Sequence, residues 1–405
     1  MAVIDIDAHY FEPFDWLEVH FPKLAAKVPG FDLAAALGDV ISGEFIAQIP
    51  KEVRPNPSDI IPEVFRQFTD RLPQGPASGT ALQAALDAMS EEEGGIVLKA
   101  FRAAGGWKTA ERLEILDAQG IDVQIVNPSI GVGPADRALG MLHDKALSLE
   151  CLAAYNTWAT DNVRGHTDRL MPTACLVLDD LDWALSEMKR MRQQGSRTFH
   201  LPAQPVGGRS LGHPDFEPVW ALAEDLGMAV VFHVGFAGKT VLADGWGNAG
   251  NFLASMMTYR CQHLQVPTNA LTALIFSGVF ERHPKFIAMS QELEVGWMPY
   301  WLSQMDTICE KNVFSKTSPW KYPLKPSEYV QRNIFASALP TSLQPLQPAF
   351  DNCPAGILAF ASDYPHVEGG PIENARKYYE EQLHAYDVAV KDEFFGSAVA
   401  RAMAL

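Results

Sequence analysis

Short runs of apolar residues alternate along most of this chain with segments whose apolar positions recur at helical spacing. The clearest run covers residues 228–235, and similar runs lie at residues 122–127 and 170–178. Continuous apolar runs of this length are typical of strands that are buried on both faces. Because a helical segment or a loop that carries one follows each run, the pattern predicts repeated strand–helix units.

Eight strands are predicted in all, and they indicate the fold. The other five lie at residues 2–10, 197–202, 285–289, 333–338 and 356–361, and helices are expected near residues 113–120, 138–164, 181–192, 216–226, 271–280, 296–311, 372–383 and 391–403. Strand–helix units produce parallel strands with right-handed crossovers, and eight of them close into a barrel. The sequence therefore predicts an α/β fold, a single (β/α)8 TIM-barrel domain over residues 1–405. An open doubly wound sheet is the alternative, but no Gly-rich turn opens a helix after the first strand, as dinucleotide binding requires.

Residues 13–106 interrupt the regular pattern. This segment is rich in proline and glycine and contains few periodic stretches. Loops this long inside a compact protein usually serve a function, and aromatic residues such as Phe14, Trp16 and Phe68 argue against a disordered linker. We therefore expect an insertion after the first strand that covers the site or contacts a second subunit, and we expect a homodimer.

Composition narrows the choice of partners. The net charge of −17 and the pI near 5.0 argue against nucleic acid or an anionic membrane as a general partner. The five cysteines are widely spaced and never form a CxxC pair, which favours reduced thiols in a cytoplasm. No signal peptide is visible, and the longest apolar stretch, residues 270–280, is far shorter than the roughly 20 residues of a membrane span. We expect a cytoplasmic protein that acts on a small molecule.

The first predicted strand carries three candidate metal ligands. Asp5, Asp7 and His9 occupy every second position, and alternation along a strand would point all three to one side. Acid and imidazole groups are costly to bury without partners, so this strand needs a cation or a dense hydrogen-bond network. A solvated strand end with capping groups is the plainer interpretation.

Further metal-type residues occur at the other predicted strand ends. They are Glu12 just past the first strand, His200 on the fourth, His233 on the fifth, Glu292 and Glu294 after the sixth, and Asp363 with His366 after the eighth. In a TIM barrel the active site lies at the carboxyl ends of the strands, so these side chains are expected to meet at one mouth and bind metal. His200 could instead be a structural histidine, and Glu294 could lie on the first turn of the following helix, where acids are favoured.

Four motifs together resemble those of a known superfamily. They are Asp7-Ala8-His9 after an apolar strand, Val230-Val231-Phe232-His233, Gly296-Trp297-Met298-Pro299-Tyr300 before a helix, and Ser362-Asp363-Tyr364-Pro365-His366. In combination they are similar to the amidohydrolase superfamily, and within it to the amidohydrolase-2 branch that contains aminocarboxymuconate semialdehyde decarboxylase and the resorcylate and carboxyvanillate decarboxylases. The resemblance covers both ends of the chain and everything from Trp107 onward, but not the insertion.

The resemblance implies a distorted barrel in which Asp7, His9, His233 and Asp363 hold a metal ion. The chain departs from the family at two places. Asp7 stands where the first strand usually has a histidine, a replacement seen in some members. Residues 289–294, which include Glu292, stand where decarboxylase relatives carry a histidine that assists proton transfer. In a mononuclear hydrolase Glu292 is the candidate base, and Asp363 could share that role.

The number of carboxylates changes the picture of the metal. Asp7, Glu292 and Asp363 together with two or three histidines suit two hard ions better than a single zinc, and iron becomes a candidate. The chain also resembles, less closely, a branch of the superfamily whose barrels carry a nonheme di-iron centre. Its members are monooxygenases of secondary metabolism, such as antibiotic biosynthesis, with CoA-linked substrates. That resemblance implies two Fe ions, the first on Asp7, His9, His233 and Asp363 and the second on His200 and Glu292, with Glu12 or His366 adjoining.

Our leading hypothesis is a nonheme di-iron monooxygenase that hydroxylates a bulky apolar, CoA-linked metabolite, with Glu292 and His366 as catalytic groups. Because no flavin, haem or nicotinamide motif is present, its electrons would come from an external donor. An apolar pocket is expected from aromatic residues near the strand ends, of which half or more should be ordinary core: Phe11, Phe199, Phe232, Trp297 and Tyr364. The alternatives are a mononuclear zinc or manganese hydrolase or nonoxidative decarboxylase, and a noncatalytic barrel.

Overall fold

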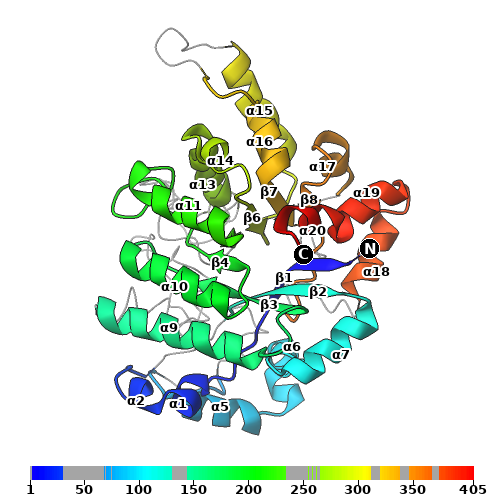
Figure 1. Cartoon of the computed structure of the whole chain (residues 1–405). Helices are drawn as coiled ribbons and strands as arrows, with labels where there is room; N and C mark the ends of the chain where they lie inside the picture. The colour runs from blue at the N-terminus through cyan, green and yellow to red at the C-terminus, as the bar shows by residue number, and fades with distance from the viewer. Residues whose placement is uncertain are drawn as a thin grey trace.

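Eight parallel strands form the centre of the molecule, with helices around them (Figure 1). The computed structural model describes residues 2–30, 68, 70–73, 75–129, 144–233, 254, 258, 261, 265–311, 320–337, 346–366 and 374–405. The strands follow one another in chain order and are β1 (Ile4–His9), β2 (Val123–Asn127), β3 (Leu170–Cys175), β4 (Thr198–His200), β5 (Ala229–His233), β6 (Ala288–Gln291), β7 (Ile334–Ser337) and β8 (Leu358–Ala359). Every predicted strand is present, so the predicted barrel is confirmed.

Backbone hydrogen bonds from β1 to the segment after β8 nearly close the barrel. The amide of Ile6 donates to the carbonyl of Phe360 at 3.0 Å, and the amide of Asp363 donates to the carbonyl of Asp7 at 2.8 Å. The amide of His9 donates to the carbonyl of Tyr364, also at 2.8 Å. These bonds bring the two ends of the chain, which carry the Asp7–His9 and Asp363 motifs, into direct contact.

The helices mostly lie where the apolar spacing predicts them. Those after the insertion are α7 (Thr109–Gln119), α9 (Lys145–Asn162), α10 (Leu181–Gln193), α11 (Glu217–Leu226), α13 (Gln265–Phe276), α14 (Val279–Arg282), α15 (Met298–Lys311), α16 (Pro326–Asn333), α17 (Gln347–Asn352), α18 (Ala375–Gln382), α19 (Val388–Asp392) and α20 (Ala398–Met403). Helices α16 and α17 were not predicted. The single helix predicted over residues 271–280 is wrong, because Gly278 takes a left-handed φ of 73° and separates α13 from α14.

Two apolar clusters build the barrel. A large cluster lies between the strands and the surrounding helices, and it includes Phe199 and Phe232. A smaller cluster fills the barrel interior from strand residues such as Ile6, Val231 and Met289, and Val399 of α20 packs into it. Branched and long aliphatic side chains of this kind typically fill a TIM-barrel interior. The interior is therefore a packed core rather than a pore.

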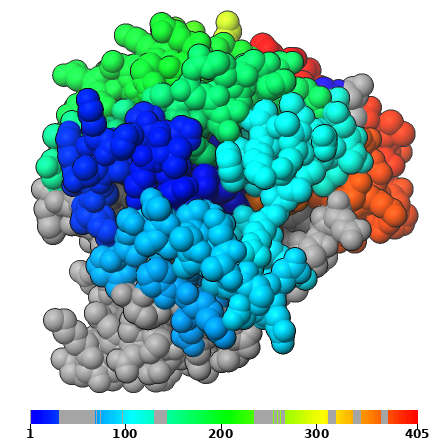
Figure 2. All heavy atoms as spheres, turned by 90° about the horizontal axis from the view of Figure 1, so that it is seen from below, coloured from blue at the N-terminus to red at the C-terminus, as the bar shows by residue number. Residues whose placement is uncertain are grey.

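The insertion contains more helix than its sequence suggests. Its described parts form α1 (Trp16–His20), α2 (Pro22–Ala25), α5 (Gly79–Ala88) and α6 (Glu91–Phe101). Figure 2 shows the residues up to 30, in dark blue, beside the residues from 75 onward, in lighter blue. The expectation of a largely irregular segment is wrong for them, because Ser78 and Ser90 begin α5 and α6 with side-chain caps. Phe68 and Leu98 anchor a separate apolar cluster. Residues 31–67, part of the predicted insertion, lie outside the described residues.

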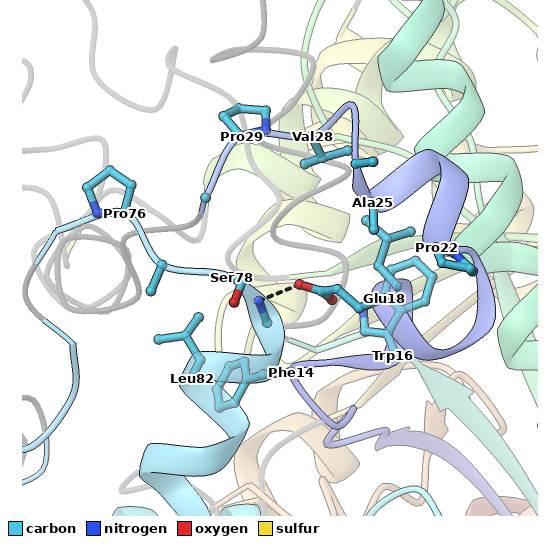
Figure 3. A pocket seen from close by; sticks show the side chains of 15 residues that line it. Phe14, Trp16, Glu18, Pro22, Ala25, Val28, Pro29, Pro76, Ser78 and Leu82 are labelled. Atoms are coloured by element: carbon cyan, nitrogen blue, oxygen red, sulfur yellow. Dashed lines mark hydrogen bonds between the residues drawn. The ribbon is translucent and has the colours of Figure 1, made fainter.

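A cavity of about 470 Å³ lies between α1, α2 and the start of α5 (Figure 3). Its wall is mainly apolar, and the carboxylate of Glu18 accepts a hydrogen bond from the amide of Gly79 at 2.5 Å.

Within the described residues, no helix is both long and apolar enough to cross a bilayer.

Candidate metal centre

Two histidines and an aspartate from β1 and β5 meet at the carboxyl ends of the strands. The Nε2 atoms of His9 and His233 lie 3.0 Å apart, and the Oδ1 atom of Asp7 lies 3.4 Å from each of them. All three side chains are buried. Strands that are neighbours neither in sequence nor in the sheet therefore present three ligand atoms to one point.

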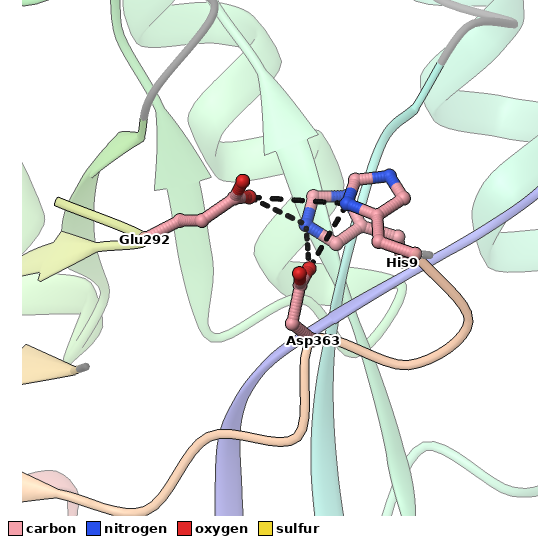
Figure 4. A group of neighbouring side chains, drawn as sticks. His9, Glu292 and Asp363 are labelled. Carbon is pink, nitrogen blue, oxygen red and sulfur yellow. Dashed lines mark ion pairs between the residues drawn. The ribbon is translucent and has the colours of Figure 1, made fainter. Parts of the chain in front are cut away.

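A second group overlaps the first at His9. Figure 4 shows the carboxylates of Glu292 and Asp363 pointing toward His9, whose Nε2 atom lies 3.5 Å from Asp363 Oδ1 and 3.8 Å from Glu292 Oε2. Glu292 Oε2 also lies 3.1 Å from His233 Nε2, and Asp363 Oδ1 lies 2.9 Å from His366 Nδ1. Among the described residues, the two groups that could hold a metal ion are thus Asp7–His9–His233 and His9–Glu292–Asp363–His366.

The rings of His9 and His366 are oriented by hydrogen bonds through the nitrogen that faces away from the candidate metal site. His9 Nδ1 lies 2.8 Å from the carbonyl of Pro128, to which it donates, so its Nε2 atom is the one left for a metal. His366 Nε2 lies 3.0 Å from the hydroxyl of Ser129. The His366 ring also stacks on His9 with 3.9 Å between ring centroids. Such outer partners are typical of metal-binding histidines.

The backbone at the site departs from ordinary strand geometry. Glu292 has a φ of 56°, Glu294 of 57° and Asp363 of 55°. Residues other than glycine rarely adopt this left-handed conformation, and it costs about 1–3 kcal/mol where the side chain is not glycine. Strain of this kind clusters at functional sites. Here it directs the side chains of Glu292 and Asp363 into the group just described.

The side chains perturb one another strongly. Burial lowers the pKa of His9 to about 4, and the nearby His366 adds to the shift. Burial also lowers the pKa of His233, but Asp7 and Glu292 outweigh it and hold that pKa well above its usual range. Burial raises the pKa of Glu292, yet His233 brings it down to about 2. Burial and the nearby Glu292, in contrast, raise the pKa of Asp363 well above its usual range. A bound cation would stabilise the ionised form of these carboxylates.

The residues present fit a divalent metal. The Oδ2 atoms of Asp7 and Asp363 are buried, and no hydrogen bond reaches them from the described part of the chain. Buried carboxylate oxygens normally have partners, and a bound cation would be a suitable partner for these two. Imidazole nitrogens with carboxylate oxygens suit zinc, manganese and iron. Asp7, His9 and His233 lie in one candidate group and Asp363 in the other, so their shared binding of a first ion stays a prediction.

The expectation that Asp5 joins Asp7 and His9 at the site is wrong. Ile4 and Ile6 fill the barrel interior, so Asp5 lies on the other side of β1, where it accepts hydrogen bonds from Gln124 at 2.7 Å and from Ser362. The pairing register of β1 against β2 shifts between Asp5 and Ala8. A bulge of this kind adds one residue to a strand and breaks the alternation of side chains.

The other predicted site residues occupy neighbouring positions. His200 ends β4 and is not part of either ligand group, although burial, His233 and His9 lower its pKa to about 3. Glu12 lies outside both groups too: it accepts hydrogen bonds from the hydroxyl of Tyr155 at 2.6 Å and from the amide of Ser129 at 3.0 Å. Their roles as metal ligands remain predictions.

The expected aromatic pocket is only partly assembled. Phe199 and Phe232 are fully buried in the core between strands and helices, as ordinary packing residues. Phe11 lies edge-on to His366 with 5.4 Å between centroids, and Phe101 of α6 packs against Phe11 at 4.8 Å. The insertion therefore reaches the residues that surround the candidate ligands.

Several polar residues of the site gave no clear signal in the sequence. Arg112 of α7 is buried and donates to the carbonyl of His9, and Asn127 of β2 donates to Asp7. Gln291, the last residue of β6, contacts Asn127. Asn127 and Gln291 lie at strand ends, which is the pattern that could have found them, whereas nothing local marks Arg112.

Comparison with known proteins identifies the family. The model of a family described as amidohydrolase matches residues 4–401, almost the whole chain. This chain belongs to the amidohydrolase family. No curated protein sequence matches it significantly.

Solved structures of an amidohydrolase and of two decarboxylases have the same fold. An amidohydrolase from Mycobacterium avium subsp. paratuberculosis is 19% identical, with a TM-score of 0.68 over 100% of this chain and 98% of that one. The 5-carboxyvanillate decarboxylase of Sphingomonas paucimobilis is also 19% identical, with a TM-score of 0.59 over 100% and 99%. A dihydroxybenzoic acid decarboxylase from a Polaromonas species, solved with manganese and the inhibitor 2-nitroresorcinol, is 15% identical, with a TM-score of 0.60 over 100% and 97%. The family match together with the two candidate ligand groups shows that the chain is a metal-dependent amidohydrolase-fold enzyme.

Proposed function

We propose that this chain is a divalent-metal-dependent nonoxidative decarboxylase of a small hydroxylated aromatic acid. The observation that carries the proposal is that Asp7, His9 and His233 meet at one buried point, with Asp363 Oδ1 3.5 Å from the same Nε2 atom of His9. Structures that match over nearly their full length and are named as decarboxylases of such acids support it, one of them with manganese. This reading replaces the oxygenase as our leading hypothesis.

The reaction exchanges a carboxylate for a proton. The bond from the ring carbon to the carboxyl carbon breaks, CO2 leaves, and the electron pair that remains on the ring carbon takes up one proton. A bound Mn²⁺ or Zn²⁺ supplies a Lewis acid that draws electron density from a substrate oxygen. The chain must then orient the acid and hold the proton.

Two groups of the site are placed to exchange that proton. Glu292 lies at the rim with a side chain 11% exposed, and its Oε2 atom is 3.8 Å from His366 Nδ1. His366 Nε2 lies within hydrogen-bond distance of the hydroxyl of Ser129, at 3.0 Å. Proton transfer needs a donor within reach of the reacting atom and a route to replace the proton. In this assignment Glu292 and His366 do the work of the histidine that decarboxylase relatives carry after the sixth strand.

The test combines metal content with product analysis. Protein purified without added metal should contain one manganese or zinc per chain and should convert a member of a hydroxybenzoate panel under anaerobic conditions. In D2O the product should carry deuterium at the carbon that lost CO2. His366→Asn should abolish turnover but leave metal content unchanged, whereas Glu150→Gln, a change at a carboxylate 53% exposed, should alter neither. Absence of bound metal, or turnover only with oxygen, would overturn the proposal.

One observation favours a second candidate, the di-iron monooxygenase. The two ligand groups share His9 and together offer three carboxylates and three imidazoles, enough donors for two ions. Two bound Fe ions would supply oxygen activation, with electrons from an external donor and an apolar, CoA-linked metabolite as substrate. Two irons per chain, with oxygen consumption that depends on an added reductant, would favour this candidate over the decarboxylase.

A further inference from the structure

A layer of buried amide and hydroxyl groups lies directly beneath Asp7 inside the barrel. The side-chain amide of Asn127 donates to Asp7 Oδ1 at 2.8 Å and to Gln291 Oε1 at 2.8 Å. The hydroxyl of Thr173 donates to Asn127 Oδ1 at 2.8 Å and lies 2.9 Å from the hydroxyl of Thr198. These residues come from β2, β6, β3 and β4, and all are buried. The layer therefore joins four strands to one carboxylate.

The direction of the hydrogen bonds in this layer is determined at both ends. Gln291 Nε2 donates to the backbone carbonyl of Ile6, so Gln291 Oε1 must face Asn127. Thr173 occupies Asn127 Oδ1 as a donor, so the NH2 group of Asn127 must face Asp7. An Asn side chain free to flip could present either its oxygen or its nitrogen to Asp7. Here only the nitrogen can do so without leaving buried groups unpaired.

A polar layer at this depth is unusual for a barrel interior. The residues just below it, such as Ile6, Met171 and Val231, are apolar, and TIM-barrel interiors are usually filled by aliphatic side chains. Burying four polar side chains contributes less to stability than burying aliphatic ones of similar size, even when all are hydrogen-bonded. The layer donates a hydrogen bond to one charged group, the carboxylate of Asp7. The other oxygen of this carboxylate, Oδ2, is buried and has no hydrogen-bond partner among the described residues.

We propose that Asn127 is a positioning residue that orients the carboxylate of Asp7 toward the metal and thereby sets metal affinity, with Thr173 and Gln291 holding the amide of Asn127 in its working direction. A carboxylate oxygen has two lone pairs, so Asp7 Oδ1 can accept from Asn127 and still face the Nε2 atoms of His9 and His233, each 3.4 Å away. Without the amide, Asp7 Oδ1 would lose a donor that lies outside the candidate ligand groups and helps to fix its direction. This inference rests on the proposed metal-binding function.

The test measures metal binding directly in the full-length chain. The dissociation constant for Mn²⁺, determined by competition with a fluorescent chelator, should rise about 10- to 100-fold in Asn127→Leu, the usual effect of losing a second partner of a metal ligand. Thr173→Val should raise it less, because the amide remains but can flip. Thr198→Val removes a hydroxyl of the same layer three hydrogen bonds away from Asp7, so it should lower thermal stability without changing the dissociation constant.

The outcomes separate this inference from the proposed function. Folded Asn127→Leu protein that binds Mn²⁺ as tightly as the wild type would overturn the positioning role. If Asn127→Leu does not fold, Thr173→Val decides, and wild-type affinity in that variant would overturn it as well. A parallel loss of stability and affinity in Thr198→Val would indicate a purely structural layer and would also overturn it. If the wild type itself binds no divalent metal, the proposed function fails first.

Discussion

Arg112→Met tests whether a buried arginine holds the two ligand-bearing segments together. The guanidinium of Arg112 donates to the carbonyls of Gly105 and His9 at 2.6 Å each, and more weakly to that of Tyr364 at 3.4 Å. It also donates to Gln124 Oε1 at 3.0 Å, and its side chain is 3% exposed. His9 is a candidate ligand and Tyr364 follows Asp363, so one side chain connects the first strand to the segment after the eighth.

The expected loss of stability follows from these contacts. A buried carbonyl left without a donor costs about 1–3 kcal/mol, and the two shortest bonds of Arg112 serve two such carbonyls. Burial lowers the pKa of Arg112 to about 10, because the buried guanidinium has lost its hydration. Removing the charge therefore also removes this desolvation cost, which partly offsets the loss of the hydrogen bonds. The net decrease in the free energy of unfolding should be about 2–4 kcal/mol. Because domains are typically stable by about 5–15 kcal/mol, the variant should still fold.

Urea denaturation of metal-stripped protein measures this decrease. Arg112→Lys keeps the charge but cannot span the same acceptors, so it should fall between the wild type and Arg112→Met. Arg164→Met is the matched control, because that side chain is 77% exposed and its loss should be nearly neutral. The reasoning is refuted if Arg112→Met unfolds within about 0.5 kcal/mol of the wild type, the range of ordinary surface substitutions.

Three further predictions concern the ligands themselves. Glu292→Gln should remove one of two metal ions if Glu292 is a ligand. If Glu292 only transfers protons, the variant should keep a single bound ion but lose turnover. Metal analysis with an activity assay distinguishes these outcomes, and full activity would contradict both. Asp363→Asn should abolish binding of the first metal ion, and full occupancy measured by metal analysis would refute our assignment. His200 has an ordinary pKa of 6.5 and a folded-state pKa lowered by burial to about 3, so its contribution to stability is complete above pH 6.5 and is lost as the pH falls toward 3. In metal-stripped His200→Asn the dependence of unfolding free energy on pH in this range should be flatter by about 1.4 kcal/mol per pH unit, and an unchanged slope in urea titrations would contradict it.

The barrel could be predicted from the sequence because its signal is local. Apolar runs such as residues 228–235 report a strand through their own composition, and a glycine such as Gly120 or Gly227 ends the preceding helix in the left-handed conformation. The candidate ligands Asp7, His9, His233 and Asp363 could be predicted for a related reason. Parallel strands of a barrel end at one mouth, so a polar residue at a strand end has a known destination.

The direction of individual side chains could not be predicted in this way. Simple alternation placed Asp5 beside Asp7, but a register shift in β1 sends Asp5 to Gln124 and Ser362 instead. Whether a strand has a bulge depends on how it pairs with its neighbour, which its own residues do not record. His200 ends β4 as expected, yet the positions of the other strands leave it outside both ligand groups.

The sequence by itself determined the order of strands and helices and the set of residues that reach the barrel mouth, because hydrophobic periodicity and strand ends are properties of short segments. Only the tertiary structure decided which of those residues lie together, and it showed that Arg112 and Asn127 donate hydrogen bonds to His9 and Asp7. The physical reason is that hydrogen bonds such as that from Asn127 to Asp7 join residues more than a hundred positions apart, and their geometry exists only after the barrel has closed.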